Sequence, residues 1–136
     1  MTWGKSMLLL FICITLAACT TKMGLRDDFD KSMKSYNRML RWHELENAGM
    51  LYVENNIRDE FMKKAEALKK RGVTITDFRI LTSECLPEKK SGEVIAEFDY
   101  FVLPSNRMKT TTYRQEWIYQ DIINSWKLNS GLPSFD

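Results

Sequence analysis

The chain has 136 residues, of which 20 are basic and 18 acidic, so its formal net charge at pH 7 is +2. This length suits a single domain with its own hydrophobic core. The near balance of charges gives no reason to expect nucleic acid as a partner.

The N-terminal segment has the three parts of a secretory signal peptide. Lys5 supplies positive charge, residues 7–14 are apolar, and Ala17 and Ala18 are the small residues that precede a cleavage site. The apolar stretch ends before it reaches the ~20 residues that a helix needs to cross a bilayer. We therefore expect a removable signal here rather than a membrane-spanning helix.

Cys19 follows the two alanines, and Leu16-Ala17-Ala18-Cys19 resembles the lipobox of bacterial lipoproteins. In that family the cysteine sulfur receives a diacylglycerol, the preceding peptide is removed, and the new amino terminus is usually acylated. A thiolate is the best nucleophile in a protein for such an alkylation. The resemblance therefore implies that Cys19 attaches the protein to membrane lipid; a chance cysteine after an apolar segment is the alternative.

The same resemblance implies how the chain is divided and where it is placed. Residues 1–18 would be the removed signal peptide, residues 19–26 a lipidated tether, and residues 27–136 a single domain. In lipoproteins an Asp directly after the cysteine tends to retain the protein in the inner membrane, and this chain has Thr20 there. We expect the bacterial cell envelope, with the outer membrane facing the periplasm favoured over the inner membrane.

The three cysteines leave one thiol to account for. If the resemblance holds, Cys13 is removed with the signal and Cys19 carries lipid, which leaves Cys85 without a partner within the mature chain. We expect a buried free thiol that packs as a small apolar residue. A disulfide between two chains, or a reactive thiol, remains open.

An apolar stripe at helical spacing predicts a helix that opens at Asp27 and Asp28, whose charges complement the helix dipole. The pattern continues to Tyr52, with Gly49 as a bend or a point of close packing. One kinked helix, or two helices that meet near Trp42, fits equally well. The stripe consists of Phe29, Met33, Tyr36, Leu40 and His43.

A second helix is predicted over residues 57–70. Asn55 and Asn56 are helix N-cap residues, and Gly72 can adopt the left-handed conformation that ends a helix. Its basic residues should form a solvated face, or alternatively contact anionic lipid headgroups. They are Lys63, Lys64, Lys69, Lys70 and Arg71.

After Gly72 the hydrophobic period changes to two, which predicts strands over residues 73–86, 93–103 and 108–119 and a short one at 126–128. The alternation of the first strand changes parity near Thr76-Asp77, where we expect a β-bulge. The inward face of the second strand should carry Val94, Ala96, Phe98, Tyr100 and Val102; that of the third should carry Tyr113, Gln115, Trp117 and Tyr119. The apolar tail at residues 132–135 should dock on the domain.

Helices followed by an antiparallel meander indicate an α+β fold, with N-terminal helices packed on a curved four-stranded antiparallel sheet. Gln115-x-Trp117-x-Tyr119, followed by Trp126-Lys127-Leu128, resembles the last hairpin of bacterial domains with the nuclear-transport-factor-like cone. The order of elements is similar to that superfold and to the cystatin-like one. Because these superfolds host enzymes, binders and assembly modules, the resemblance does not fix a function.

Several polar groups on the inward face suggest a candidate pocket for a small apolar ligand. Tyrosine hydroxyls, an indole N–H and an amide all need partners when they are buried. A fully packed core built from the same side chains is the alternative. The predicted pocket wall consists of Tyr36, His43, Tyr100, Tyr113, Gln115 and Trp117.

The sequence offers little for catalysis. His43 is the only histidine, and no metal-ligand spacing, phosphate loop or nucleophile motif accompanies it. The carboxylates nearest in sequence to the predicted pocket, Glu97 and Asp99, alternate away from Tyr100. We therefore expect no catalytic, cofactor or metal residues, and favour a noncatalytic, membrane-tethered module that binds an envelope protein or a small apolar ligand. The alternative is a small isomerase- or dehydratase-like enzyme with His43 as general base.

Overall fold

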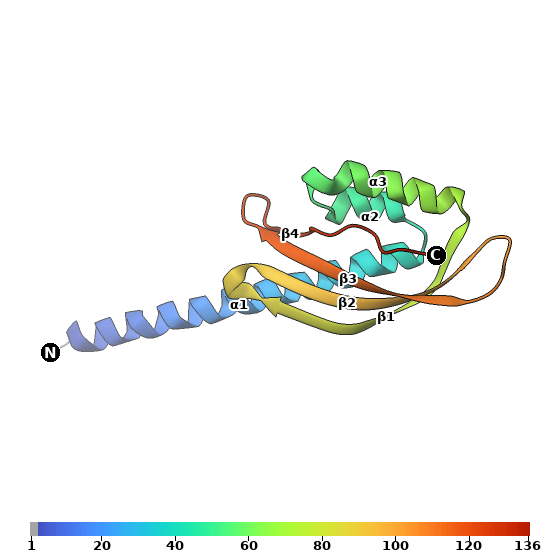
Figure 1. Ribbon diagram of the computed structural model, residues 1–136. Helices are drawn as coiled ribbons and strands as arrows, with labels where there is room; N and C mark the ends of the chain where they lie inside the picture. Colours follow the sequence, from blue (N-terminus) through green and yellow to red (C-terminus); the bar gives the residue numbers. More distant parts are fainter. Residues whose placement is uncertain (1–2) are drawn as a thin grey trace.

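The computed structural model describes the backbone of residues 3–136 and the side chains of residues 22–136. Over the described backbone, the chain forms three α-helices, then a four-stranded antiparallel sheet in the order β1-β2-β3-β4 (Figure 1). The expected α+β fold is confirmed in this form; the narrower nuclear-transport-factor-like or cystatin-like assignment stays a prediction. The elements are α1 (Trp3–Arg41), α2 (Leu45–Tyr52), α3 (Asn55–Lys70), β1 (Val73–Leu86), the 3₁₀ turn η1 (Pro87–Lys89), β2 (Ser91–Val102), β3 (Lys109–Gln120) and β4 (Ser125–Leu128).

Helix α1 begins earlier than predicted. Asp27 and Asp28 lie in its middle, and residues 19–26, expected to be a tether, are helical. The helix can begin earlier because the segment before Asp27 contains no proline. Figure 1 shows the N-terminal half of α1 projecting beyond the sheet. The Cys19 side chain and the rest of the lipobox lie outside the described side chains.

The first two helices are separate, which settles the choice between one kinked helix and two. α1 ends at Arg41 and α2 begins at Leu45. His43 occupies the turn with a positive φ of 63°. Gly49 marks close packing: a Cβ there would come within 2.9 Å of Phe61 side-chain atoms.

The boundaries of α3 differ slightly from the prediction. The helix begins at Asn55, its N-cap is Glu54, and no side chain caps it. Asn55 and Asn56 therefore occupy the first turn rather than the cap. Gly72 has φ of 76°, as its predicted role at the end of the helix requires.

The predicted bulge in the first strand is confirmed, and a second one accompanies it. The pairing of β1 with β2 shifts between Ile75 and Asp77 and again between Ile80 and Thr82. Each shift inserts one unpaired residue and changes which side chains face the helices. The second shift was not predicted, because Leu81 keeps the strand apolar on both faces.

The core lies between the helices and one face of the sheet, and the predicted inward faces are largely confirmed. The α1 stripe packs against them through Phe29, Met33, Tyr36 and Leu40, all at most 2% exposed. Val102 and Tyr119, near the strand ends, are half-buried. The sheet contributes Ile75, Val94, Ala96, Phe98, Tyr100, Tyr113, Gln115, Trp117, Trp126 and Leu128.

The C-terminal tail docks as predicted, and two basic residues of the α3 region hold it. Leu132 and Phe135 are buried. Lys64 Nζ donates to Leu132 O and Arg71 Nη2 donates to Phe135 O, each at 2.8 Å. These two residues therefore attach the tail to the domain through hydrogen bonds, and they are not part of a purely solvated face.

Candidate functional site

A set of five buried polar side chains joins α1 to β3; we call it the buried polar network. The Tyr36 and Tyr113 hydroxyls lie 2.8 Å apart. Gln115 Nε2 donates to Asn37 Oδ1 at 2.6 Å, and Asn37 Nδ2 donates to Gln115 Oε1 at 3.2 Å. Trp117 Nε1 donates to the same Oε1 at 3.2 Å. All five residues are at most 3% exposed, so these groups satisfy one another inside the core.

Two sequence periods bring the network together. Alternation along β3 points Tyr113, Gln115 and Trp117 to the same face of the sheet. On α1, Asn37 lies one turn after Met33, and its Nδ2 also donates to Met33 O at 2.8 Å. The two amide groups are therefore held in one orientation by partners on both sides.

The two tyrosines of the network are neutral at physiological pH. Burial, followed by the neighbouring Tyr113 hydroxyl, raises the pKa of Tyr36 well above its usual value. Burial also raises the pKa of Tyr113, although its hydrogen bonds with Tyr36 and Ser130 act in the opposite direction. Neither hydroxyl is poised to exchange a proton near pH 7.

His43 does not join the other five residues of the predicted pocket. Its exposed side chain follows the end of α1, where His43 Nε2 lies 3.1 Å from Ile75 O. The helical stripe predicted its inward orientation, but α1 has already ended at Arg41. A role as general base beside the buried tyrosines therefore has no geometric support.

Tyr100 belongs to the tail rather than to the network. Its hydroxyl donates to Asp136 O at 2.8 Å, and its ring meets the Phe135 ring edge-on at 4.9 Å. The remaining predicted residues, Tyr36, Tyr113, Gln115 and Trp117, all take part in the network. Their polar groups point at one another, which is the geometry of the packed-core alternative.

Three hollows of the described surface lie around the buried polar network, and one of them is bordered by a residue of that network. A pocket of about 80 Å³ is lined by His43, Leu68 and Ile75 among others. This volume is well below the ~300 Å³ at which small-molecule sites begin. Two more open grooves, of about 290 and 200 Å³, lie beside Gly92 and Gly131 respectively. Trp117 lines the groove beside Gly92, whereas none of the three hollows is lined by Tyr36, Tyr100, Tyr113 or Gln115.

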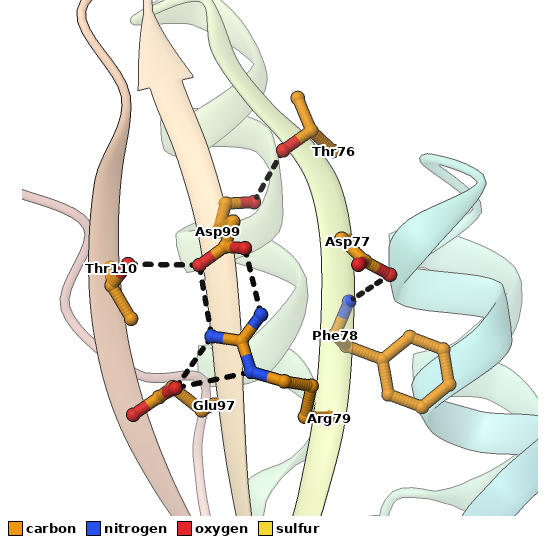
Figure 2. A network of polar contacts seen from close by, with 7 residues as sticks. All are labelled: Thr76, Asp77, Phe78, Arg79, Glu97, Asp99 and Thr110. Carbon is orange, nitrogen blue, oxygen red and sulfur yellow. Dashed lines mark hydrogen bonds and ion pairs between the residues drawn. The ribbon is translucent and has the colours of Figure 1, made fainter.

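The outer face of the sheet carries a different set of polar contacts, which we call the outer ionic network (Figure 2). Arg79 pairs with both Glu97 and Asp99, and its Nη1 lies 2.8 Å from Asp99 Oδ2. Thr110 Oγ1 donates to Asp99 Oδ1 at 2.8 Å. The hydrogen bonds from Arg79, and then from Thr110, lower the pKa of the Asp99 carboxyl. The two carboxylates thus face away from the helices, as the strand alternation predicted.

Two participants were missed from the sequence. Asn37 was passed over because it is polar, yet it lies four residues after Met33 and three before Leu40, on the apolar stripe. Arg79 was missed because its partners depend on the register between β1 and β2, which two bulges determine. Of these two residues, only Asn37 could have been identified from the spacing of residues in the sequence.

Cys85 is a free thiol, but it is half-buried rather than buried. Burial raises the pKa of the thiol, while the nearby Arg26 acts in the opposite direction. The thiolate, which is the reactive form, is therefore disfavoured at neutral pH.

Over the part of the chain whose side chains are described, no group of three His, Cys, Asp or Glu residues is arranged to hold a metal ion. A search of the described residues for a helix long and apolar enough to cross a membrane also finds none.

A solved structure of low sequence identity aligns with part of this chain. The intermembrane-space region of the chloroplast protein ARC6 aligns with 73% of this chain and 92% of its own, at 11% sequence identity and a TM-score of 0.44. No protein-family model and no curated protein sequence matches the chain.

Proposed function

We propose that this protein is a lipid-anchored, noncatalytic binding or assembly module of the bacterial cell envelope. Acyl chains on Cys19 would hold it, and the Thr20 that follows favours the outer membrane, with the domain facing the periplasm. The domain would present surfaces to an envelope partner rather than transform a substrate.

The observation that carries the noncatalytic part is the filling of the concave face. The side chains that a cone-shaped enzyme would use for its substrate form the buried polar network instead, and each is at most 3% exposed. The Tyr36 hydroxyl is already hydrogen-bonded to the Tyr113 hydroxyl, and the Asn37 amide is already hydrogen-bonded to the Gln115 amide. A ligand would have to break these bonds and displace packed side chains before it could enter.

The anchoring part rests on Leu16-Ala17-Ala18-Cys19 and its position behind the apolar segment. Two or three acyl chains give stable attachment, because burial of each CH₂ contributes ~0.8 kcal/mol. The first described ion pair with the body of the domain, Lys22 with Glu88, begins only three residues after Cys19. A lipid on Cys19 would thus hold the whole domain close to the bilayer.

The enzyme alternative gains no support from the geometry. An isomerase- or dehydratase-like site would need a base beside a substrate cavity, and the pocket of about 80 Å³ that His43 borders is too small for one. Glu97 and Asp99 are occupied by Arg79 on the opposite face (Figure 2).

Metabolic labelling with a fatty acid tests the anchor. Protein expressed from the full sequence should carry the label and fractionate with membranes. Cys19→Ala should lose the label, whereas Cys85→Ala is the matched control and should keep it. Label that persists in Cys19→Ala, or none in the unaltered protein, would overturn the proposal.

A further inference from the structure

Two turns of the domain meet α1 at the end where that helix enters the body. The turn between β1 and β2 contacts the helix through Lys22 Nζ, which lies 3.5 Å from Glu88 Oε1. It also contacts the turn between β3 and β4, because Lys90 Nζ lies 2.6 Å from Asp121 Oδ2. We call this end the proximal tip. In Figure 1 it lies on the side from which α1 projects, opposite the β2–β3 connection and the C-terminus.

The proximal tip exposes large aliphatic side chains at positions where polar residues are usual. Ile122 and Ile123 occupy the turn between β3 and β4 and are 98% and 51% exposed. Turns favour Gly, Asn, Asp and Ser. Met23, on the adjoining part of α1, is 70% exposed. Although single exposed apolar residues are ordinary, two successive isoleucines at the end of a hairpin expose apolar surface that the fold itself does not use.

The distance along the chain limits how far this tip can lie from the lipid. Cys19 and Lys22 are three residues apart. A fully extended chain spans about 3.5 Å per residue, so the separation is at most about 10 Å. In the helical conformation of α1 it is about 4.5 Å. Acyl chains on Cys19 would therefore bring the proximal tip to the membrane surface in either conformation.

We infer that the proximal tip docks on the bilayer to which Cys19 is anchored, and that Ile122 and Ile123 insert into its interface. The inference rests on the proposed lipidation and specifies the orientation of the domain. Interfacial segments bury their apolar faces about 5–10 Å deep, a depth that a hairpin turn bearing two isoleucines can reach. The opposite end of the sheet then faces away from the membrane.

The contact is apolar rather than electrostatic. Lys22 and Lys90 at the tip are already paired with Glu88 and Asp121. Lys89 in the same turn and Arg26 near Glu88 add positive charge at this end, but the two isoleucines that insert are uncharged and need no anionic headgroup. Insertion should therefore occur in zwitterionic as well as anionic bilayers, and it should persist at high salt.

An environment-sensitive dye on the turn tests this orientation. The lipidated protein is prepared from the full sequence as Cys85→Ser with Ile122→Cys, labelled, and reconstituted into phosphatidylcholine vesicles with or without phosphatidylglycerol. The matched control carries the dye at Met108→Cys, which is also exposed but lies in the β2–β3 connection. Circular dichroism verifies that both variants fold.

The expected result is a blue shift and quenching by brominated lipid for the dye at position 122, in both kinds of vesicle, and a water-like spectrum at position 108. Water-like emission at position 122 in acylated, vesicle-bound protein would overturn the inference while leaving the anchor intact. A blue shift confined to phosphatidylglycerol vesicles would show electrostatic contact and also overturn it. Protein without an acyl group would refute the anchor, and with it the inference.

Discussion

The two faces of the sheet connect neighbouring elements through different kinds of side chain. The inner face joins α1 and β3 through the uncharged groups of the buried polar network, centred on Gln115. The outer face joins β1, β2 and β3 through the charged groups of the outer ionic network, centred on Arg79 (Figure 2).

The two faces differ in whether water can replace a hydrogen bond after one of its partners is removed. Water can reach Arg79, Glu97 and Asp99, so it solvates whatever a substitution leaves unpaired, and exposed pairs add little stability. Water does not reach Asn37 or Gln115, so a lost partner leaves a buried polar group unsatisfied. Similar hydrogen bonds on the two faces should therefore differ greatly in their effect on the free energy of unfolding.

The largest effect is expected for Gln115→Ala. It removes partners of Asn37 and Trp117 and leaves a cavity, so the free energy of unfolding should fall by about 3–5 kcal/mol. Denaturant unfolding measures this loss. Thr112→Ala, an exposed position of the same strand, is the control and should change it by less than about 0.5 kcal/mol. Equal losses at the two positions would remove the contrast between the faces.

Gly92→Ala tests how tightly the core is packed at Phe29, without removing a side-chain hydrogen bond. A Cβ at Gly92 would collide with the ring of Phe29, so we expect a loss of about 1–3 kcal/mol. Gly131 has no atom within 4 Å of its Cβ position. Gly131→Ala should therefore leave the thermal midpoint almost unchanged, and a similar drop in both variants would argue against tight packing at Phe29.

Tyr113→Phe should cost about 1 kcal/mol at pH 7, because Tyr36 loses its hydroxyl partner. The pH dependence is more specific. The pKa of each tyrosine is raised in the folded state, so each contributes stability that is complete below the unfolded pKa of about 10. Above that pH each tyrosine costs about 1.4 kcal/mol per pH unit until the folded pKa is reached.

Tyr113→Phe should consequently lose stability less steeply than the unaltered protein as the pH rises above 10. Urea unfolding at successive alkaline pH values measures the two slopes. Thr112→Ala removes no titratable group, leaves the network intact and should retain the slope of the unaltered protein. Parallel slopes for Tyr113→Phe and the unaltered protein would mean that the two hydroxyls are not protected from ionisation by the fold.

The smallest effect is expected for Arg79→Met on the outer face. Loss of its bonds removes the main cause of the lowered pKa of Asp99, a group whose stabilisation is present above the unfolded pKa of about 3.9. That stabilisation disappears as the pH falls through the folded pKa. The difference in the free energy of unfolding between Arg79→Met and the unaltered protein should therefore be small at pH 7. It should shrink in high salt and vanish in acid. A difference as large as that of Gln115→Ala would show that the outer network is more than a surface feature.

Periodicity in the sequence predicted the parts of this molecule that depend on neighbours along one element. The inward faces of β2 and β3, the bulge near Thr76 and the end of α3 at Gly72 are of that kind. The ion pairs of Arg79 depend on the register between two strands, which its local pattern does not reveal. The inward orientation predicted for His43 was wrong, because that pattern does not show where α1 ends. The pairing of Asn37 with Gln115 joins residues 78 positions apart, which periodicity cannot detect.

The candidate pocket also shows what sequence periodicity cannot predict. Four of its six residues do lie together, because an inward face was correctly identified. Whether an inward face encloses space or fills it depends on how side-chain volumes from separate elements fit together. That fit is a property of the assembled core and leaves no signature in a single strand.

Under the proposed anchoring at Cys19, helix α1 would also limit how far from the membrane the domain can contact another molecule. It connects residue 19 to residue 41 without interruption, and at 1.5 Å per residue this section is about 33 Å long. Trp42 follows directly and is 65% exposed, with the Arg41 guanidinium 4.9 Å from the centre of its ring. For a chain held at Cys19, anything that touches this tryptophan must come within about 33 Å of the membrane surface. Under the proposed lipidation of Cys19, the length of the helix would therefore limit such contacts to structures near the same bilayer.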